Sequence, residues 1–239
     1  MEKNALFLGG TKGLGLEMAK LAVAEEMEVM IAGRTAKECS LVNEGKALGA
    51  RIDLTDGRNG IEPLLYFHRA FDVMVWSAGI HQQGSFTDLG VEDVARYTRT
   101  HFEGPVAILA NFLKANKTAM KPCHLVVIGS SSAYKARADQ SVYCALKAAK
   151  AQLARALGKE LPGEKSIPGS KVLLAHPGGM NTPFWKGRED QAVGFMDPAA
   201  VAAIIWEYMK QQTEPFCEIH IDRQSDGSAK LDVGTRMPE

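Results

Sequence analysis

ALFLGGTKGLG, residues 5–15, is the stretch that decides the fold of this chain. Its first four residues are apolar and have the length of a short buried strand. The apolar residues that follow at helical spacing, Leu14, Met18 and Leu21, predict a helix. Between them lies a run of glycines, where the backbone can turn sharply and approach an anion without a Cβ in the way. A strand, a glycine-rich turn and a helix N-terminus together predict a phosphate-binding loop.

The alternation of short apolar runs and helical stretches continues along the chain. Further buried strands are predicted at Val29–Ala32, Val73–Trp76, Leu125–Ile128, Val172–Ala175 and Glu218–Ile221. Right-handed crossovers would place the intervening helices on both faces of a parallel sheet. The expected fold class is α/β, a Rossmann-like doubly wound parallel sheet in three α/β/α layers. One domain is expected over residues 1–224, and the polar residues 225–239 are expected to form a loose C-terminal tail.

Composition narrows the class of partner. The chain has 239 residues, and its 28 Lys and Arg balance 28 Asp and Glu. No overall positive field favours nucleic acid or an anionic membrane, so a small molecule is the expected partner. The four cysteines lack metal-ligand spacing, so no metal site is expected. Because the sequence has neither a signal-peptide pattern nor an apolar run of transmembrane length, a cytoplasmic location is expected.

The end of the second predicted strand reads Ala32-Gly33-Arg34. Dinucleotide-binding folds that prefer NAD carry an acid at this point for the ribose 2′-hydroxyl, whereas folds that prefer NADP present a cation to the 2′-phosphate. Here Gly33 replaces the acid, and both Arg34 and Lys12 could reach the phosphate. The sequence therefore predicts NADP(H) as the cofactor. The alternative is that both cations are solvated surface charges.

Tyr143 and Lys147 form the strongest chemical signal. Their i,i+4 spacing on a predicted helix puts the phenol and the ammonium group on one face. A positive charge about 4 Å away stabilises a phenolate by roughly 4 kcal/mol, so the pKa of Tyr143 is expected to fall by up to about three units. Ser130, thirteen residues before Tyr143, could hold a substrate oxygen beside the phenol. For an isolated pair, a tyrosine beside a snorkelling lysine would be the better interpretation.

These motifs resemble those of the short-chain dehydrogenase/reductase superfamily. The Gly-x-x-x-Gly-x-Gly spacing of the glycine run and the set of Ser130, Tyr143 and Lys147 match its pattern, and the resemblance covers about residues 5–221. It implies hydride transfer between NADP(H) and a small carbonyl or alcohol substrate, with Tyr143 as general acid/base. The cofactor-binding positions that it implies are Gly9, Thr11, Lys12, Gly13, Leu14, Gly15, Arg34, Asp53, Leu54, Ser77, Ala78, Gly79, Tyr143, Lys147, Pro177, Gly178 and Thr182.

The chain departs from the family pattern at a catalytic position. His101 stands where the resemblance implies an asparagine that helps to relay protons from the lysine. A histidine with a pKa near 6.5 could carry protons and add a pH dependence, could weaken the relay, or could pack quietly in a slow or non-catalytic protein. The sequence leaves the role of Asp53 undecided and predicts no catalytic role for His176. Asp53 could contact adenine or cap a helix, and His176 is expected to pack beside a strand end.

Three loops beyond the strand ends are expected to contact the substrate: Ile80–Phe86, Ala133–Ala138 and Pro183–Met196. The last holds Phe184 and Trp185 among charged residues, which suggests a lid over a small or flat apolar carbonyl. The resemblance also implies a homodimer or homotetramer formed through long helices. Two alternatives remain, a non-catalytic NADPH-binding sensor or scaffold, and an epimerase or dehydratase of the extended branch, for whose extra domain the chain has no room.

Overall fold

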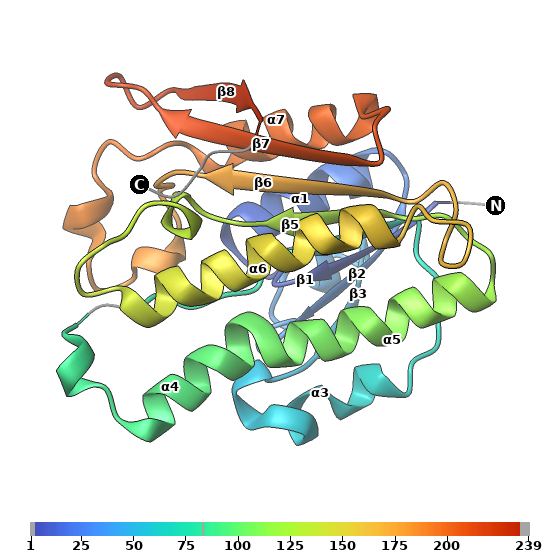
Figure 1. The fold of residues 1–239 in the computed structure, drawn as a ribbon, viewed down its shortest axis with the longest axis horizontal. Coiled ribbons are helices and arrows are strands. Elements are labelled where there is room, and N and C mark those ends of the chain that lie inside the picture. The colour runs from blue at the N-terminus through green and yellow to red at the C-terminus, as the bar shows by residue number, and fades with distance from the viewer. Residues whose placement is uncertain (1–2, 83, 235–239) are drawn as a thin grey trace.

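An eight-stranded sheet forms the centre of the molecule (Figure 1). The computed structural model describes residues 3–82 and 84–234. Strand order is β3-β2-β1-β4-β5-β6-β7-β8, with parallel pairing up to β7 and an antiparallel β7–β8 pair. The strands are β1 (Asn4–Leu8), β2 (Glu28–Gly33), β3 (Leu48–Arg51), β4 (Val73–Trp76), β5 (His124–Ile128), β6 (Lys171–Pro177), β7 (Phe216–Arg223) and β8 (Ala229–Val233). The predicted Rossmann-like α/β fold is confirmed.

Helices cover both faces of the sheet. They are α1 (Gly13–Ala24), α2 (Ser40–Asn43), α3 (Gly57–Leu65), α4 (Val91–Thr98), α5 (Gly104–Thr118), α6 (Ser141–Glu160) and α7 (Pro198–Gln211). Along β1, Phe7 belongs to the core under α1 and α7, whereas Leu6 belongs to the core under α3, α5 and α6. Both faces of the central strands are therefore buried, which is why they read as continuous apolar runs.

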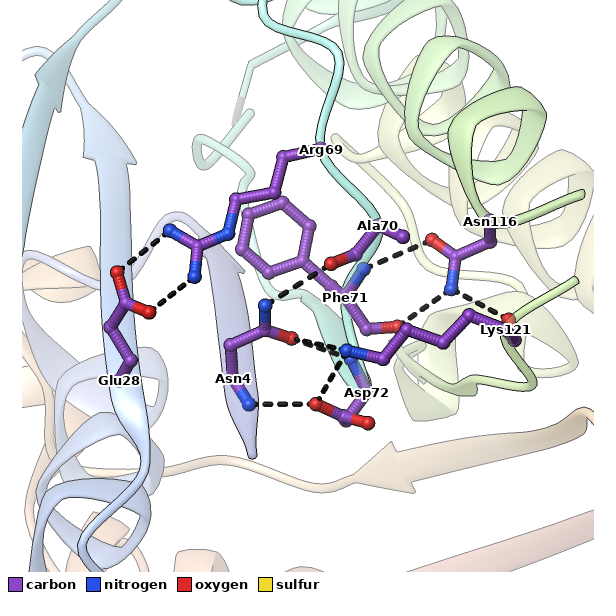
Figure 2. A network of polar contacts seen from close by, with 8 residues as sticks. All are labelled: Asn4, Glu28, Arg69, Ala70, Phe71, Asp72, Asn116 and Lys121. Atoms are coloured by element: carbon purple, nitrogen blue, oxygen red, sulfur yellow. Dashed lines mark hydrogen bonds and ion pairs between the residues drawn. The ribbon is translucent and has the colours of Figure 1, made fainter. Parts of the chain in front are cut away.

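A polar network closes the amino-terminal edge of the sheet, the edge opposite to the glycine loop (Figure 2). The fully buried side chain of Asn116, near the end of α5, accepts a hydrogen bond from Phe71 N–H (3.0 Å) and donates to the carbonyl oxygens of Phe71 (2.7 Å) and Lys121 (2.9 Å). Lys121 also pairs with Asp72 at 2.9 Å, directly before β4. The network satisfies main-chain groups that burial would otherwise leave unpaired, and it fixes α5 to β4.

The carboxyl-terminal segment corrects one expectation. Residues 225–239 are predicted to be a loose tail, but Ala229–Val233 form β8, which pairs with β7 from Ile219 to Arg223. The polar, largely exposed character of β8 is typical of an edge strand, whose outer side faces solvent. Residues 235–239 lie outside the described part of the chain. In the part that is described, no helix is long and apolar enough to cross a membrane.

Candidate active site

A cavity of about 880 Å³ opens at the carboxyl ends of the central strands. This is where ligands bind in open α/β sheets, next to the point where the strand order reverses. The sequence-predicted site residues that line the cavity are Gly9, Thr11, Lys12, Gly13, Leu14, Arg34, Asp53, Leu54, Ser77, Ala78, Gly79, Ser130, Tyr143, Lys147, Pro177, Gly178 and Thr182. Two predicted residues, Gly15 and His101, are not among the lining residues.

The glycine loop has the shape that a phosphate group needs. Gly9 has a φ of +89°, and a Cβ at this position would come within 2.6 Å of Ala78. A Cβ on Gly15 would lie 2.3 Å from the carbonyl oxygen of Gly9, so Gly15 lets α1 pack against the loop rather than lining the cavity. The loop leads directly into the N-terminus of α1 at Gly13, where main-chain N–H groups have no helical partner. These residues fit a dinucleotide.

Two exposed cations, Lys12 and Arg34, stand at the rim of the cavity, next to Gly33. Neither forms an ion pair within residues 3–82 and 84–234. Nearby, the Asp53 carboxylate accepts hydrogen bonds from the N–H (2.9 Å) and hydroxyl (2.8 Å) of Thr55. Asp53 therefore caps a short helical turn, which is one of its two expected roles, while it also lines the cavity.

Tyr143 and Lys147 project from α6, and both are buried. The Lys147 amine lies 5.5 Å from the centre of the Tyr143 ring and donates to the carbonyl oxygen of Gly129 at 3.1 Å. Burial raises the pKa of Tyr143 to about 12, although a hydrogen bond with Ser130 acts in the opposite direction. Burial also lowers the pKa of Lys147 to about 8. The expected lowering of the Tyr143 pKa is therefore not found in this arrangement, where loss of hydration is the largest influence on the phenol and raises its pKa.

His101 lies in a short π-helical segment, Arg99–Glu103, between α4 and α5. Its ring is 1% exposed and packs edge-on against Tyr143, with centroids 5.4 Å apart. Nε2 lies 3.0 Å from the main-chain N of Ile80 and 2.7 Å from its O. Burial, followed by the charge of Lys147, lowers the pKa of His101 to about 3. Of the three alternatives for His101, this burial favours a ring that stays neutral at physiological pH over one that titrates near pH 6.5.

Comparison with known proteins decides the family. A model of the short chain dehydrogenase family matches residues 3–192. The chain belongs to this family. An uncharacterized oxidoreductase of Schizosaccharomyces pombe is 26% identical over 184 residues, which are 76% of this chain and 62% of that protein. One from Bacillus subtilis is 28% identical over 83% of this chain and 57% of its own length. The chain thus spans about three fifths of these two curated relatives.

Other proteins match this chain over nearly all of their own length. The sepiapterin reductase of Chlorobaculum tepidum is 26% identical, with 97% of this chain and 100% of that protein covered. A solved short chain dehydrogenase/reductase family protein superimposes with a TM-score of 0.79 at 26% identity, over 91% of this chain and 94% of that one. A Burkholderia cenocepacia short chain dehydrogenase in complex with NADP has the same fold (TM-score 0.75, 23% identity, 95% and 97% covered).

Three side chains of the predicted substrate loops were not singled out from the sequence. His81 contacts the rings of Phe184 (5.2 Å) and Trp185 (4.7 Å), and neither of its ring nitrogens has a hydrogen-bond partner among the described residues. The second, the fully buried Gln82, accepts a hydrogen bond from Tyr143 N–H at 2.6 Å. Residue 83 of the same predicted loop lies outside the described residues. The third, Arg137, donates to the hydroxyls of the two serines after Ser130 at 3.1 Å. The sequence predicted that the loop of Arg137 contacts the substrate, but it did not predict the hydrogen bonds from Arg137 to these serines.

Proposed function

We propose that this short-chain dehydrogenase is an NADP(H)-dependent enzyme that transfers a hydride between the nicotinamide and a small carbonyl or alcohol substrate. One observation carries the proposal: Ser130, Tyr143 and Lys147, from two separate elements, line the same cavity as the glycine loop. A protein that only binds a nucleotide has no need of this set of side chains in the cavity.

The preference for NADP(H) is supported by charge at the cavity rim. Arg34 and Lys12 both line the cavity near Gly33, where the main chain of β2 ends without an acidic side chain. A 2′-phosphate would gain charge-assisted hydrogen bonds from the planar guanidinium group of Arg34. The ribose of NAD, which lacks this phosphate, would gain none. We therefore expect NADPH to bind more tightly than NADH.

The proton chemistry follows from burial. NADPH, when bound, supplies the hydride. Tyr143, whose pKa of about 12 keeps the phenol protonated at neutral pH, donates its proton to the oxygen of the reduced carbonyl. The Ser130 hydroxyl holds the same oxygen, and the Lys147 ammonium group stabilises the negative charge left on the phenol. A protonated phenol at rest favours the direction of carbonyl reduction.

The substrate is a small carbonyl compound with an apolar, flat body. Phe184 and Trp185 stand over the cavity, and the ring of Phe195 lies 5.2 Å from that of Trp185. The His81 ring, whose pKa burial and the charge of Arg188 lower to about 4, is neutral and completes this aromatic wall. Aromatic walls favour flat ligands, which stack against them or meet their edges.

Oxidation of NADPH, followed by absorbance, tests the proposal. The panel is nitrobenzaldehyde, diacetyl and phenanthrenequinone, with NADH in place of NADPH as a comparison. We expect Tyr143→Phe to lower kcat by at least about 100-fold. The matched control is Tyr208→Phe on α7, a residue that does not line the cavity, which should leave the rate unchanged. A rate that survives Tyr143→Phe would contradict the assigned role.

A second candidate is a non-catalytic NADPH-binding sensor or scaffold. The observation that favours it is the neutral, buried His101 at the position where the family's proton relay has an asparagine. NADPH binding without turnover of any compound in the panel would support this candidate, and His101→Asn would then be the variant in which to look for recovered activity.

A further inference from the structure

Behind Ser130 lies a buried polar chain that the proposed reaction does not use. His176, at the end of β6, is fully buried. Its Nδ1 atom lies 3.2 Å from the main-chain N of Ser130 and 2.9 Å from its O. On the other side of the ring, Nε2 lies 3.1 Å from a carboxylate oxygen of Glu218 on β7. The imidazole therefore bridges the catalytic loop and the next strand of the sheet.

Glu218 fixes the orientation of this ring. Its side chain is 1% exposed and receives both arms of the Arg155 guanidinium group, at 3.0 and 2.8 Å. Burial raises the pKa of Glu218, but the hydrogen bonds from His176 and Arg155 outweigh it and bring the pKa down to about 2. An ionised carboxylate can only accept hydrogen bonds, so Nε2 of His176 carries a proton. Nδ1 is then the ring nitrogen that contacts the main chain of Ser130.

The His176 ring can form a hydrogen bond with the main chain of Ser130 in either of its protonation states. In the neutral ring, Nδ1 accepts a hydrogen bond from Ser130 N–H. In the doubly protonated ring, Nδ1 donates to the Ser130 carbonyl oxygen. The preceding residue shows how closely the ring fits, because a Cβ on Gly129 would come within 2.6 Å of Nδ1. The Gly129 carbonyl oxygen is also the acceptor for Lys147. The His176 ring therefore packs against the main chain of Gly129 and Ser130, which carries the Ser130 side chain and the acceptor for Lys147.

We propose that His176 is a positioning residue that fixes the main chain of Ser130 for the reaction. The inference rests on the proposed function, since Ser130 must act on a substrate for its position to affect a rate. The contacts close a ring of elements, because Arg155 lies on α6, the helix that carries Tyr143. The chain of contacts from Ser130 through His176 and Glu218 to Arg155 thereby fixes the loop of Ser130 relative to α6, which carries Tyr143.

Two substitutions separate the two sides of the imidazole. In His176→Asn, the short amide can place a polar atom near the position of Nδ1, but it does not reach Glu218. In His176→Gln, the longer amide can reach the position of Nε2 and leaves Ser130 without its partner. We expect His176→Asn to keep kcat within about threefold, and His176→Gln to lower it about 10- to 100-fold. The dissociation constant of NADPH should stay unchanged in both variants. Equal losses, or a greater loss in His176→Asn, would overturn the proposal.

A double-mutant cycle guards against general damage to the fold. His176→Gln is combined with Ser130→Ala, and kcat is measured with the best carbonyl substrate of the panel. If His176 acts through Ser130, its substitution should cost less than about twofold once the serine hydroxyl is gone. Full additivity of the two losses would show that His176 only supports the structure, and would refute the positioning role.

Hydrogen exchange of the Ser130 amide tests the contact without any turnover. We expect slow exchange in the wild type and in His176→Asn, and exchange at least about tenfold faster in His176→Gln. If the wild type reduces no carbonyl compound, the proposed function fails, whereas the exchange rates still decide whether His176 holds Ser130. Unchanged exchange in His176→Gln would overturn the inference even in an active enzyme.

Discussion

Tyr143, Lys147 and His101 lie close together in a region that solvent barely reaches, and burial acts on each against its charged form. Tyr143 stays a phenol, His101 stays a neutral imidazole, and Lys147 alone has a pKa, about 8, inside the working range of an enzyme. Of these three groups, Lys147 is therefore the one whose charge changes within that range. The i,i+4 spacing alone predicted a lowered pKa for Tyr143, because spacing carries no information on how far the phenol is removed from water.

The pH dependence of carbonyl reduction follows from this charge. Because the pKa of Lys147 is lowered to about 8, its ammonium group is present below pH 8 and is lost as the pH rises above it. Without this charge the phenolate formed from Tyr143 is less stable, so kcat/KM should fall above about pH 8. Arginine keeps its charge over the whole range, so Lys147→Arg should remove this fall, at a lower overall rate.

The same profile checks His101. Its pKa of about 3 predicts that no change in rate near pH 6.5 arises from this residue. The measurement is kcat/KM against pH in the wild type and in His101→Asn. An acid limb near pH 6.5 that disappears in His101→Asn would show that the ring does titrate and carries protons, as one of the sequence-based hypotheses held.

Arg34 is predicted to select the cofactor. Replacing it with serine should remove a charge-assisted contact worth about 1.5–3 kcal/mol, so NADPH should bind roughly 10- to 100-fold more weakly. NADH should be affected less than about threefold, since it has no 2′-phosphate. Lys37→Ser, which removes an exposed cation outside the cavity lining, is the control. If both substitutions change NADPH binding equally, Arg34 is only a solvated surface charge.

Some site residues could be predicted from the sequence and others could not, for a physical reason. Ser130, Tyr143 and Lys147 keep fixed spacings within one strand-loop-helix unit, so local sequence contains their geometry. His176 and Glu218 come together only because β6 and β7 are neighbours in the sheet. A signal was present, since Glu218 and His220 alternate with apolar residues in β7. Sequence alone could not say which neighbour those polar side chains would meet.

At the scale of elements, strands and helices were easier to predict than their irregularities. Continuous apolar runs predicted the central strands because both faces are buried. Residues 91–118 do not form one continuous α-helix but α4, a π-helical segment and α5 in succession. The wider turn between Arg99 and Glu103 lies where His101 meets Ile80. Such segments often occur at functional sites, but hydrophobic periodicity does not reveal them.

The end of α5 is predicted to depend on Asn116. In Asn116→Leu, the main-chain N–H and carbonyl of Phe71 lose their partner while they stay buried, because the side chain of Asn116 makes both contacts. We expect the free energy of unfolding to fall by about 2–4 kcal/mol. Thr118→Ala, at an exposed position of the same helix, should change it by less than about 0.5 kcal/mol. Urea denaturation measures both. A loss below about 1 kcal/mol in Asn116→Leu would mean that other groups or water replace the amide.

Across the whole molecule, the chain builds β1 to β3 outward in one direction and returns to place β4 beside β1. The cavity lies at this reversal, which is where open α/β sheets bind their ligands. The alternating pattern did not predict β8. An edge strand next to solvent has no need of apolar alternation, and its residues read as a polar tail.

The β7–β8 hairpin gives the last prediction. His220 on β7 stacks on His176 at 4.9 Å, lies 3.1 Å from the Tyr134 hydroxyl, and lies 2.8 Å from the Gly234 carbonyl oxygen beyond β8. A chain that ends at Ser228 would lose β8 and open this cluster to water. We expect its free energy of unfolding to be about 2–4 kcal/mol lower than that of a chain that ends at Gly234, because the β7–β8 hydrogen bonds and the contact of His220 with the Gly234 carbonyl oxygen are gone. Denaturation of the two truncated proteins measures the difference. Equal stability would show that β8 contributes nothing, as the prediction of a loose tail implied, and that the buried histidine pair is held by β6, β7 and Tyr134 alone.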